Sequence, residues 1–158
     1  MGGRAVAYTG TTVAFARAEP VQNGRRSISD RYDRTVAQLQ EALSSLGVTV
    51  ERGEPSGAFC PGSQSLSAGG KIVGMAQRVR EEAALTAGLV VTRDHEKLAR
   101  VLKPTYDTLG VEFDPSAVGS IRRAGGRATT EDVTRTVERA LVGGAEPTPM
   151  DVGRLLND

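Results

Sequence analysis

The sequence predicts an α+β fold in which helices pack against a mixed β-sheet. Runs rich in β-branched residues are interleaved with segments whose apolar residues recur at helical spacing. These strands and helices do not follow one another at the regular spacing of βαβ units. The length of 158 residues is typical of one domain with a substantial core.

The N-terminal segment is predicted to form a β-hairpin. Residues 4–8 (RAVAY) and 11–16 (TTVAFA) are short β-prone runs, and the Thr-Gly pair between them is a turn signal. Residues 19–26 contain Pro, Asn and Gly and are therefore expected to form a loop.

A long helix is predicted over residues 29–47. Its apolar residues recur at helical spacing, Ser29 or Asp30 can cap its start, and Gly47 suits its end. The apolar stripe consists of Tyr32, Val36, Leu39, Leu43 and Leu46. Residues 48–52 (VTVER) are expected to form the next strand.

A long loop, residues 53–70 (GEPSGAFCPGSQSLSAGG), is rich in Gly, Pro and Ser. A loop of this length inside a compact domain is usually functional or disordered. Residues 71–79 and 86–93 are then predicted to be strands. The interior glycine of the first strand, Gly74, suggests a bulge or the close approach of another backbone or a ligand.

The C-terminal half is predicted to contain further helices. Residues 94–103 form a helix capped by Asp94, and residues 104–110 extend or follow it with their proline in a first turn. Residues 113–127 are expected to be a basic, Gly-rich loop. A terminal helix is predicted over residues 129–144, with Val133, Val137 and Leu141 on one face.

The composition argues against several classes of function. The net charge of +1 offers no strong field for nucleic acid or a membrane, and 4% aromatic residues with no tryptophan provide no base-stacking platform. A single cysteine excludes a disulfide framework and favours a cytoplasmic location. A single histidine argues against a histidine-based metal site or a Ser-His-Asp triad, so no metal site is predicted. No apolar run approaches the length of a membrane span.

Lys71 is one of only three lysines, beside seventeen arginines. It follows Gly69 and Gly70, which allow a ligand to lie close to the backbone. Its ammonium group is a compact charge suited to a phosphate or a polarised carbonyl. Gly74 and Ala76 leave room along the strand for a flat or elongated ligand. The alternative is a solvated lysine in a surface turn, and spacing alone favours that alternative.

Five segments resemble the lipoate–protein ligase, octanoyltransferase and biotin–protein ligase superfamily. Residues 69–78 (GGKIVGMAQR) are similar to its lysine motif, in which a Gly-rich turn and Lys precede a strand carrying Gly, a small residue and often Gln before Arg. The other segments are GGRAVAYTGTTVAFA, YDRTVAQLQEALSSLGV, TAGLVVTRDHEKLARVLKP and VGSIRRAGG. Each segment is weak alone, but together they follow the family's order from residue 2 to about residue 125.

The resemblance implies a domain organisation and a set of site residues. Residues 1–128 would form the C-terminal part of a biotin/lipoate protein ligase-like domain, and residues 129–158 a terminal helix and flexible tail. Lys71 would bind the acyl-adenylate or the acyl carbonyl. The implied substrate-binding residues are Gly2, Gly3, Tyr8, Gly69, Gly70, Gly74, Ala76 and Gln77.

The sequence departs from the family pattern at three places. The chain begins within the family's Gly-rich motif, so we expect a domain truncated at its N-terminus. Tyr8 and Thr9 stand where the ligases often carry His-Asp. The loop before the lysine reads AFCPGSQS (residues 58–65), where the ligases tend to carry Asn-Asp.

Cys60 lies in this loop and offers a different mechanism. One octanoyltransferase branch of the family places its nucleophilic cysteine in the same loop, forms an acyl-thioester and needs no ATP. A nearby cation such as Lys71 makes a thiol a better nucleophile. The spacing between Cys60 and Lys71 is shorter than that branch usually shows. The alternative is an inert, buried thiol.

The leading prediction is a lipoate–protein ligase that uses ATP and Mg²⁺ to attach lipoate or octanoate to a lysine of a lipoyl domain through an acyl-adenylate. The first alternative is a Cys60-dependent octanoyltransferase that takes its acyl group from acyl carrier protein and needs no cofactor. The expected acceptors are lipoyl domains of 2-oxoacid dehydrogenases or the glycine cleavage H protein. A non-catalytic acyl-binding fragment is a further alternative. Biotin–protein ligase activity is disfavoured because no KWPND-like segment is present.

Overall fold

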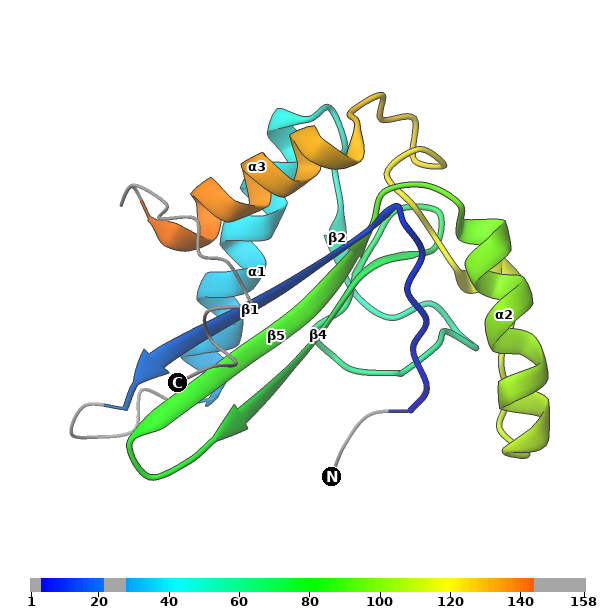
Figure 1. The fold of residues 1–158 in the computed structure, drawn as a ribbon, viewed down its shortest axis with the longest axis horizontal. Coiled ribbons are helices and arrows are strands. Elements are labelled where there is room, and N and C mark those ends of the chain that lie inside the picture. Colours follow the sequence, from blue (N-terminus) through cyan, green and yellow to red (C-terminus); the bar gives the residue numbers. More distant parts are fainter. Residues whose placement is uncertain (1–3, 22–27, 144–158) are drawn as a thin grey trace, which may run out of the picture.

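A five-stranded antiparallel sheet forms the centre of the molecule (Figure 1). The computed structural model describes residues 4–21 and 28–143. The strand order is β1-β5-β4-β3-β2. The strands are β1 (Thr12–Pro20), β2 (Glu51–Arg52), β3 (Leu66–Ser67), β4 (Lys71–Val79) and β5 (Ala83–Val91). The α+β class is therefore confirmed, but the sheet is antiparallel rather than mixed. Among the described residues, parallel pairing is limited to one isolated bridge between Lys71 and Val118.

Helices cover both faces of this sheet. They are α1 (Ile28–Ser45), α2 (His95–Thr108) and α3 (Thr130–Val142), with a short 3₁₀ turn η1 (Pro115–Ala117). The apolar residues of α1 and α3 share one core with Val90, whereas α2 packs with Leu89 and Val91 in a second core. Because successive residues of a strand point to opposite faces, α2 lies across the sheet from α1 and α3.

The predicted helices are present, and the predicted end of α1 at Gly47 is confirmed. Gly47 and Gly143 both have the left-handed φ that commonly ends a helix. Thr129 and Asp132 form a reciprocal capping box at the start of α3. Ser29 and Asp30 lie inside the first turn of α1 rather than before it, and the residue that precedes this helix is outside the described residues.

Residues 4–8 do not form the predicted strand, and the predicted N-terminal hairpin is therefore absent. The Thr-Gly turn is present, but β1 pairs along all nine residues with β5 instead. One carbonyl of this segment, that of Ala5, accepts a hydrogen bond from the Tyr106 hydroxyl at 3.0 Å rather than from a strand. The β-prone composition of residues 4–8 therefore reflects a partly buried, extended segment without a ladder.

Three further expectations are met only in part. Asp94 precedes α2 but makes no capping hydrogen bond through its side chain, since its carboxylate accepts from the Thr11 hydroxyl at 3.0 Å. Of the two alternatives for residues 104–110 the extension is confirmed, since α2 continues to Thr108, but Pro104 lies inside this helix rather than in a first turn. Of the strand expected over residues 48–52, only Glu51–Arg52 pair; the valines before them are buried in the core without a ladder.

Gly119 allows the start of β4 to pack against the loop before Ile121. Its N–H donates to the Lys71 carbonyl at 2.9 Å. A Cβ atom at Gly119 would lie 2.5 Å from the carbonyl oxygen of Gly70, which is closer than real Cβ contacts. The backbones therefore meet at a distance that only glycine permits.

We expect Gly119→Ala to lower the free energy of unfolding by about 1–3 kcal/mol, because the clash is with backbone that cannot rotate away. Urea unfolding would measure this loss. The matched control is Gly53→Ala, since a Cβ at Gly53 meets nothing within 4 Å. Equal effects of the two substitutions would contradict the close approach as the cause.

Candidate functional site

Lys71 is the buried charge at the centre of the candidate site. Its side chain is 1% exposed. The ammonium nitrogen Nζ donates to the carbonyls of Phe59 at 2.9 Å and Cys60 at 2.7 Å. It also forms an ion pair with the Glu54 carboxylate at 3.2 Å. An ammonium group has three donors, so each of them has an acceptor within the protein.

The surroundings of Lys71 explain how its side chain fits and how its acidity changes. A Cβ atom at Gly74 would lie 3.1 Å from the Lys71 Cε, so the glycine leaves the space that the lysine occupies. The Nζ lies 5.0 Å from the centre of the Phe59 ring, a cation–π distance. Burial lowers the pKa of Lys71, and the nearby Glu54 and Cys60 oppose that shift.

Both backbone polar groups of Cys60, its N–H and its carbonyl, are hydrogen-bonded. Its φ of 42° is left-handed, which is uncommon for a residue other than glycine. Its N–H donates to the Tyr106 hydroxyl at 2.6 Å, and its carbonyl accepts from Lys71. Burial is also the largest influence on Tyr106, whose pKa it raises, so the hydroxyl remains a neutral donor and acceptor.

Glu54 closes the loop that carries Cys60. Besides Lys71, its carboxylate accepts from the Gly62 N–H at 2.8 Å and from the Ser65 hydroxyl at 2.5 Å. The carboxylate of Glu54, which precedes Cys60 in the chain, thus ties down two loop residues that follow it. The loop that was expected to be functional or disordered is ordered by a buried cation and its counter-ion.

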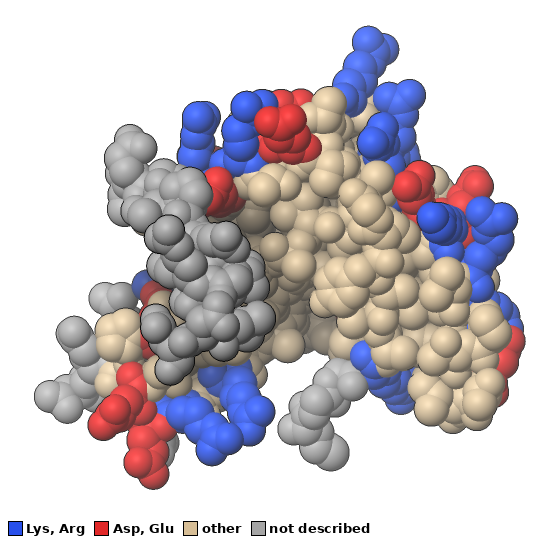
Figure 2. All heavy atoms as spheres, in the orientation of Figure 1, with Lys and Arg blue, Asp and Glu red and all other residues tan. Residues whose placement is uncertain are grey.

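A cavity of about 330 Å³ opens beside Lys71 and Cys60. Much of its lining is small: Ala14, Gly74, Ala76, Ala87 and Gly88. Ala76 and Ala87 are direct partners across β4 and β5, so two adjacent alanines lie on the same face of the sheet. In the space-filling view, charged side chains gather around the edge of the molecule and the central face is mostly uncharged (Figure 2). The cavity suits an apolar, elongated group better than an ionic one.

Five of the predicted site residues line this cavity: Tyr8, Cys60, Lys71, Gly74 and Ala76. The structure thus brings together the lysine, the cysteine and the small residues of the strand, which are separated in the sequence. Gly2 and Gly3 are outside the described residues.

Gly69, Gly70 and Gln77 do not line the cavity. The two glycines form the turn between β3 and β4 and border a separate groove beside Glu54. Gln77 lies on the other face of the sheet, where it donates to the Thr86 hydroxyl at 3.0 Å and accepts from Arg31 at 3.2 Å. The alternation of strand residues already indicates that Ala76 and Gln77 face opposite sides.

The sequence reasoning missed Glu54 and Tyr106. The burial of Tyr106 was open to prediction, since Leu98, Leu102 and Tyr106 follow one another every four residues and all three are buried. The hydrogen-bonding partners of its hydroxyl could not be predicted, because they come from residues distant in the sequence. Glu54 lies in a loop without periodicity, and nothing in its immediate sequence indicates an ion pair with Lys71.

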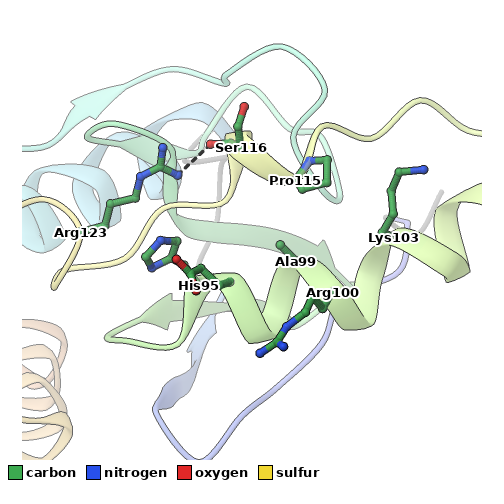
Figure 3. A pocket seen from close by; sticks show the side chains of 8 residues that line it. His95, Ala99, Arg100, Lys103, Pro115, Ser116 and Arg123 are labelled. Atoms are coloured by element: carbon green, nitrogen blue, oxygen red, sulfur yellow. Dashed lines mark hydrogen bonds between the residues drawn. The ribbon is translucent and has the colours of Figure 1, made fainter.

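A second cavity, of about 550 Å³, lies between α2 and η1 and is lined by basic side chains. Arg123 points toward Ser116, to whose carbonyl it donates at 2.8 Å, while Arg100 and Lys103 point in other directions (Figure 3). His95 is half-buried, with its Nδ1 3.2 Å from the Ser120 hydroxyl. This cavity contains no nucleophilic thiol, and its charged groups do not converge on one point.

Neither a metal cluster nor a membrane helix is found in the part of the chain that the structure describes. Within residues 4–21 and 28–143, no three His, Cys, Asp or Glu side chains lie together as metal ligands. None of the helices in these ranges has the length and apolar character needed to cross a membrane.

We expect Lys71→Met to lower the free energy of unfolding by about 2–4 kcal/mol, because two buried carbonyls and Glu54 lose their donor. Chemical denaturation would measure this change. The control is Lys103→Met, which removes an exposed ion pair with Asp107 and should cost about 0.5 kcal/mol or less. A loss no greater than that of the control would show that Lys71 does not hold the loop.

Comparison with known proteins agrees with this architecture. The chain is 32% identical over 108 residues to the octanoyl-[GcvH]:protein N-octanoyltransferase of Geobacillus kaustophilus (strain HTA426), a match that covers 67% of this chain and 38% of that protein. The fold of this chain matches lipoate-protein ligase A bound with ATP (TM-score 0.68) and protein Ta0514 of T. acidophilum with bound lipoic acid (TM-score 0.70). Both structures are 19% identical, and each match covers 90% of this chain and 55% of the other.

The chain thus spans well under half of the matched octanoyltransferase and about half of the two structures. The profile of the lipoyl protein ligase A/B catalytic domain matches residues 1–142, nearly the whole chain. The chain belongs to the lipoyl protein ligase A/B catalytic domain family.

Proposed function

We propose that this chain carries the acyl-transfer centre of a lipoyl or octanoyl transfer enzyme in which Cys60 holds the acyl group as a thioester. The observation that carries the proposal is the placement of Cys60 beside a buried cation, Lys71, where both line a cavity whose other walls are mostly apolar. The volume of about 330 Å³ falls within the range of roughly 300–1,000 Å³ that is usual for small-ligand sites.

The reaction requires two steps at the Cys60 sulfur. In the first, the Cys60 thiolate attacks the carbonyl carbon of the acyl donor; a C–S bond forms, the bond to the donor's leaving atom breaks, and that atom takes up a proton. In the second, a neutral lysine amine of the acceptor attacks the thioester; a C–N bond forms, the C–S bond breaks, and the amine's proton restores the Cys60 thiol. No nucleotide is consumed in either step.

Lys71 contributes to these steps chiefly through position and charge. Its three donors are already directed at two carbonyls of the cysteine loop and at Glu54. It therefore holds the loop that carries Cys60 against the wall of the cavity. For Nζ to donate to an acyl oxygen, one of these bonds must open first.

The matched octanoyltransferase suggests the donor and the group transferred. Its name describes transfer of an octanoyl group from GcvH to another protein. We propose the same class of reaction here, with octanoate or lipoate as the acyl group and a lysine of a lipoyl domain as acceptor. Acyl carrier protein is the alternative donor, which would present a thioester rather than an amide.

The ATP-dependent ligase is the second candidate. The observation that favours it is the same buried cation in the wall of the cavity, because an ammonium group binds a carboxylate or an acyl phosphate. ATP and Mg²⁺ would supply the activation of the carboxylate. Mg²⁺ is usually held by one or two carboxylates and the phosphates of its substrate, so a protein cage is not required.

We expect Cys60 to gain the mass of one octanoyl group when the chain is incubated with octanoyl-GcvH or octanoyl-acyl carrier protein without ATP. Intact-protein mass spectrometry would measure the adduct. Because the chain has one cysteine, any thioester is assigned without ambiguity. Cys60→Ser is the matched control and should show no adduct that hydroxylamine releases.

Absence of an adduct with either donor would refute the Cys60 mechanism. Formation of an octanoyl- or lipoyl-adenylate by Cys60→Ser in the presence of ATP and Mg²⁺ would then identify the ligase. Binding of octanoate without either reaction would identify a non-catalytic acyl-binding domain.

We expect Ala87→Leu to slow loading of an octanoyl group by about tenfold while loading of an acetyl group changes by less than about twofold, because the added carbons occupy the cavity. Rates of adduct formation with octanoyl and acetyl donors would give the ratio. Ala37→Leu, on the exposed side of α1, is the control. An unchanged ratio would show that the acyl chain lies elsewhere.

A further inference from the structure

Tyr106 joins two separate walls of the cavity through one hydroxyl group. The side chain is 0% exposed. Its oxygen accepts the Cys60 N–H at 2.6 Å and donates to the Ala5 carbonyl at 3.0 Å. A tyrosine hydroxyl has one proton to donate. Here it donates that proton to the N-terminal segment, while its oxygen accepts a hydrogen bond from the loop that carries Cys60.

The hydroxyl acts at a residue whose backbone conformation is uncommon. Cys60 has a φ of 42°, a conformation that a residue with a side chain adopts only when its surroundings enforce it. Tyr106 binds the peptide group before the Cys60 Cα and Lys71 binds the one after it. The direction of the Cα–Cβ bond, and with it the position of the thiol, is therefore set from α2 and from β4 together.

The same hydroxyl also positions the opposite wall. Residues 4–8 have no strand partner, yet Arg4, Val6 and Tyr8 line the cavity. The Ala5 carbonyl is tied to Tyr106 in the middle of this wall. One side chain from α2 therefore fixes the distance between the thiol and the wall that faces the acyl chain.

We propose that Tyr106 is a positioning residue, whose hydroxyl aligns the Cys60 thiol with the acyl cavity. The chemical use of this alignment rests on the proposed function, whereas the alignment itself does not. The competing explanation is that Tyr106 only fills the core. Its ring does pack on Phe113, with ring centres 4.9 Å apart, and Tyr106→Phe keeps that packing while it removes the hydroxyl.

The test compares two alkylating reagents on the 158-residue chain: iodoacetamide and its N-octyl derivative. In the native chain the octyl reagent should react faster with Cys60, because its tail enters the cavity and presents the reactive carbon to the thiol. Tyr106→Phe should lower the ratio of octyl to small-reagent rate constants by about tenfold, since the loop loses a buried hydrogen bond. The ratio cancels changes in the thiol's intrinsic reactivity, which both reagents share.

The matched control is Tyr32→Phe, which removes a hydroxyl that hydrogen-bonds the Gln77 backbone on the other face of the sheet. It should leave the ratio within about twofold of the native value. Thermal unfolding of both variants shows whether the fold is intact at the assay temperature. Single-turnover octanoyl loading provides a second readout. Tyr106→Phe should change the limiting rate by a larger factor than it changes the donor concentration that gives half of that rate.

Two outcomes overturn the inference. The first is a folded Tyr106→Phe whose reagent ratio stays within about twofold of the native ratio. The second is a native chain in which the octyl reagent has no advantage. Failure of acyl loading alone, with the reagent ratio behaving as expected, would count against the proposed function and leave the positioning role of Tyr106 supported.

Discussion

The burial of one ammonium group determines most of the site. A cation removed from water must find acceptors or lose its proton. Lys71 meets this requirement with two main-chain carbonyls and one carboxylate. The carbonyls can reach it only if the loop folds back over β4, and the carboxylate then ties down the far end of that loop. Without the charge, a Gly- and Pro-rich segment of this length would have little reason to adopt one conformation.

The two faces of the sheet are packed differently, one by a continuous core and the other around the cavity. On the face covered by α1 and α3, large aliphatic side chains such as Leu39 and Leu43 form a continuous core. On the other face, α2 covers only part of the sheet, and alanines and glycines leave the remainder hollow. Changes in the shape of the cavity can therefore be made with little effect on the larger core.

The sequence predicted those parts of the fold that depend on periodicity or on special backbone angles. The stripe through Val36, Leu39 and Leu43 identified α1, and Gly47 its end. Lys71 and Cys60 were selected by residue type and by resemblance, and the structure places them together. Residues 4–8 were misjudged because β-prone composition does not specify a partner strand. The hydroxyl contacts of Tyr106 join residues that lie 46 and 101 positions away, and no local pattern encodes such contacts.

The two sides of the cavity differ in mechanical stiffness. One side is the paired backbone of β4 and β5, whose ladder cannot shift without breaking several hydrogen bonds at once. The other is the segment of residues 4–8, which has no ladder and is anchored at the Ala5 carbonyl. Local opening of such a segment requires far less free energy than global unfolding. Under the proposed function, a long acyl chain would enter by lifting this segment away from the paired strands, and the rate of exchange would then report on the segment rather than on the chemistry of the thiol.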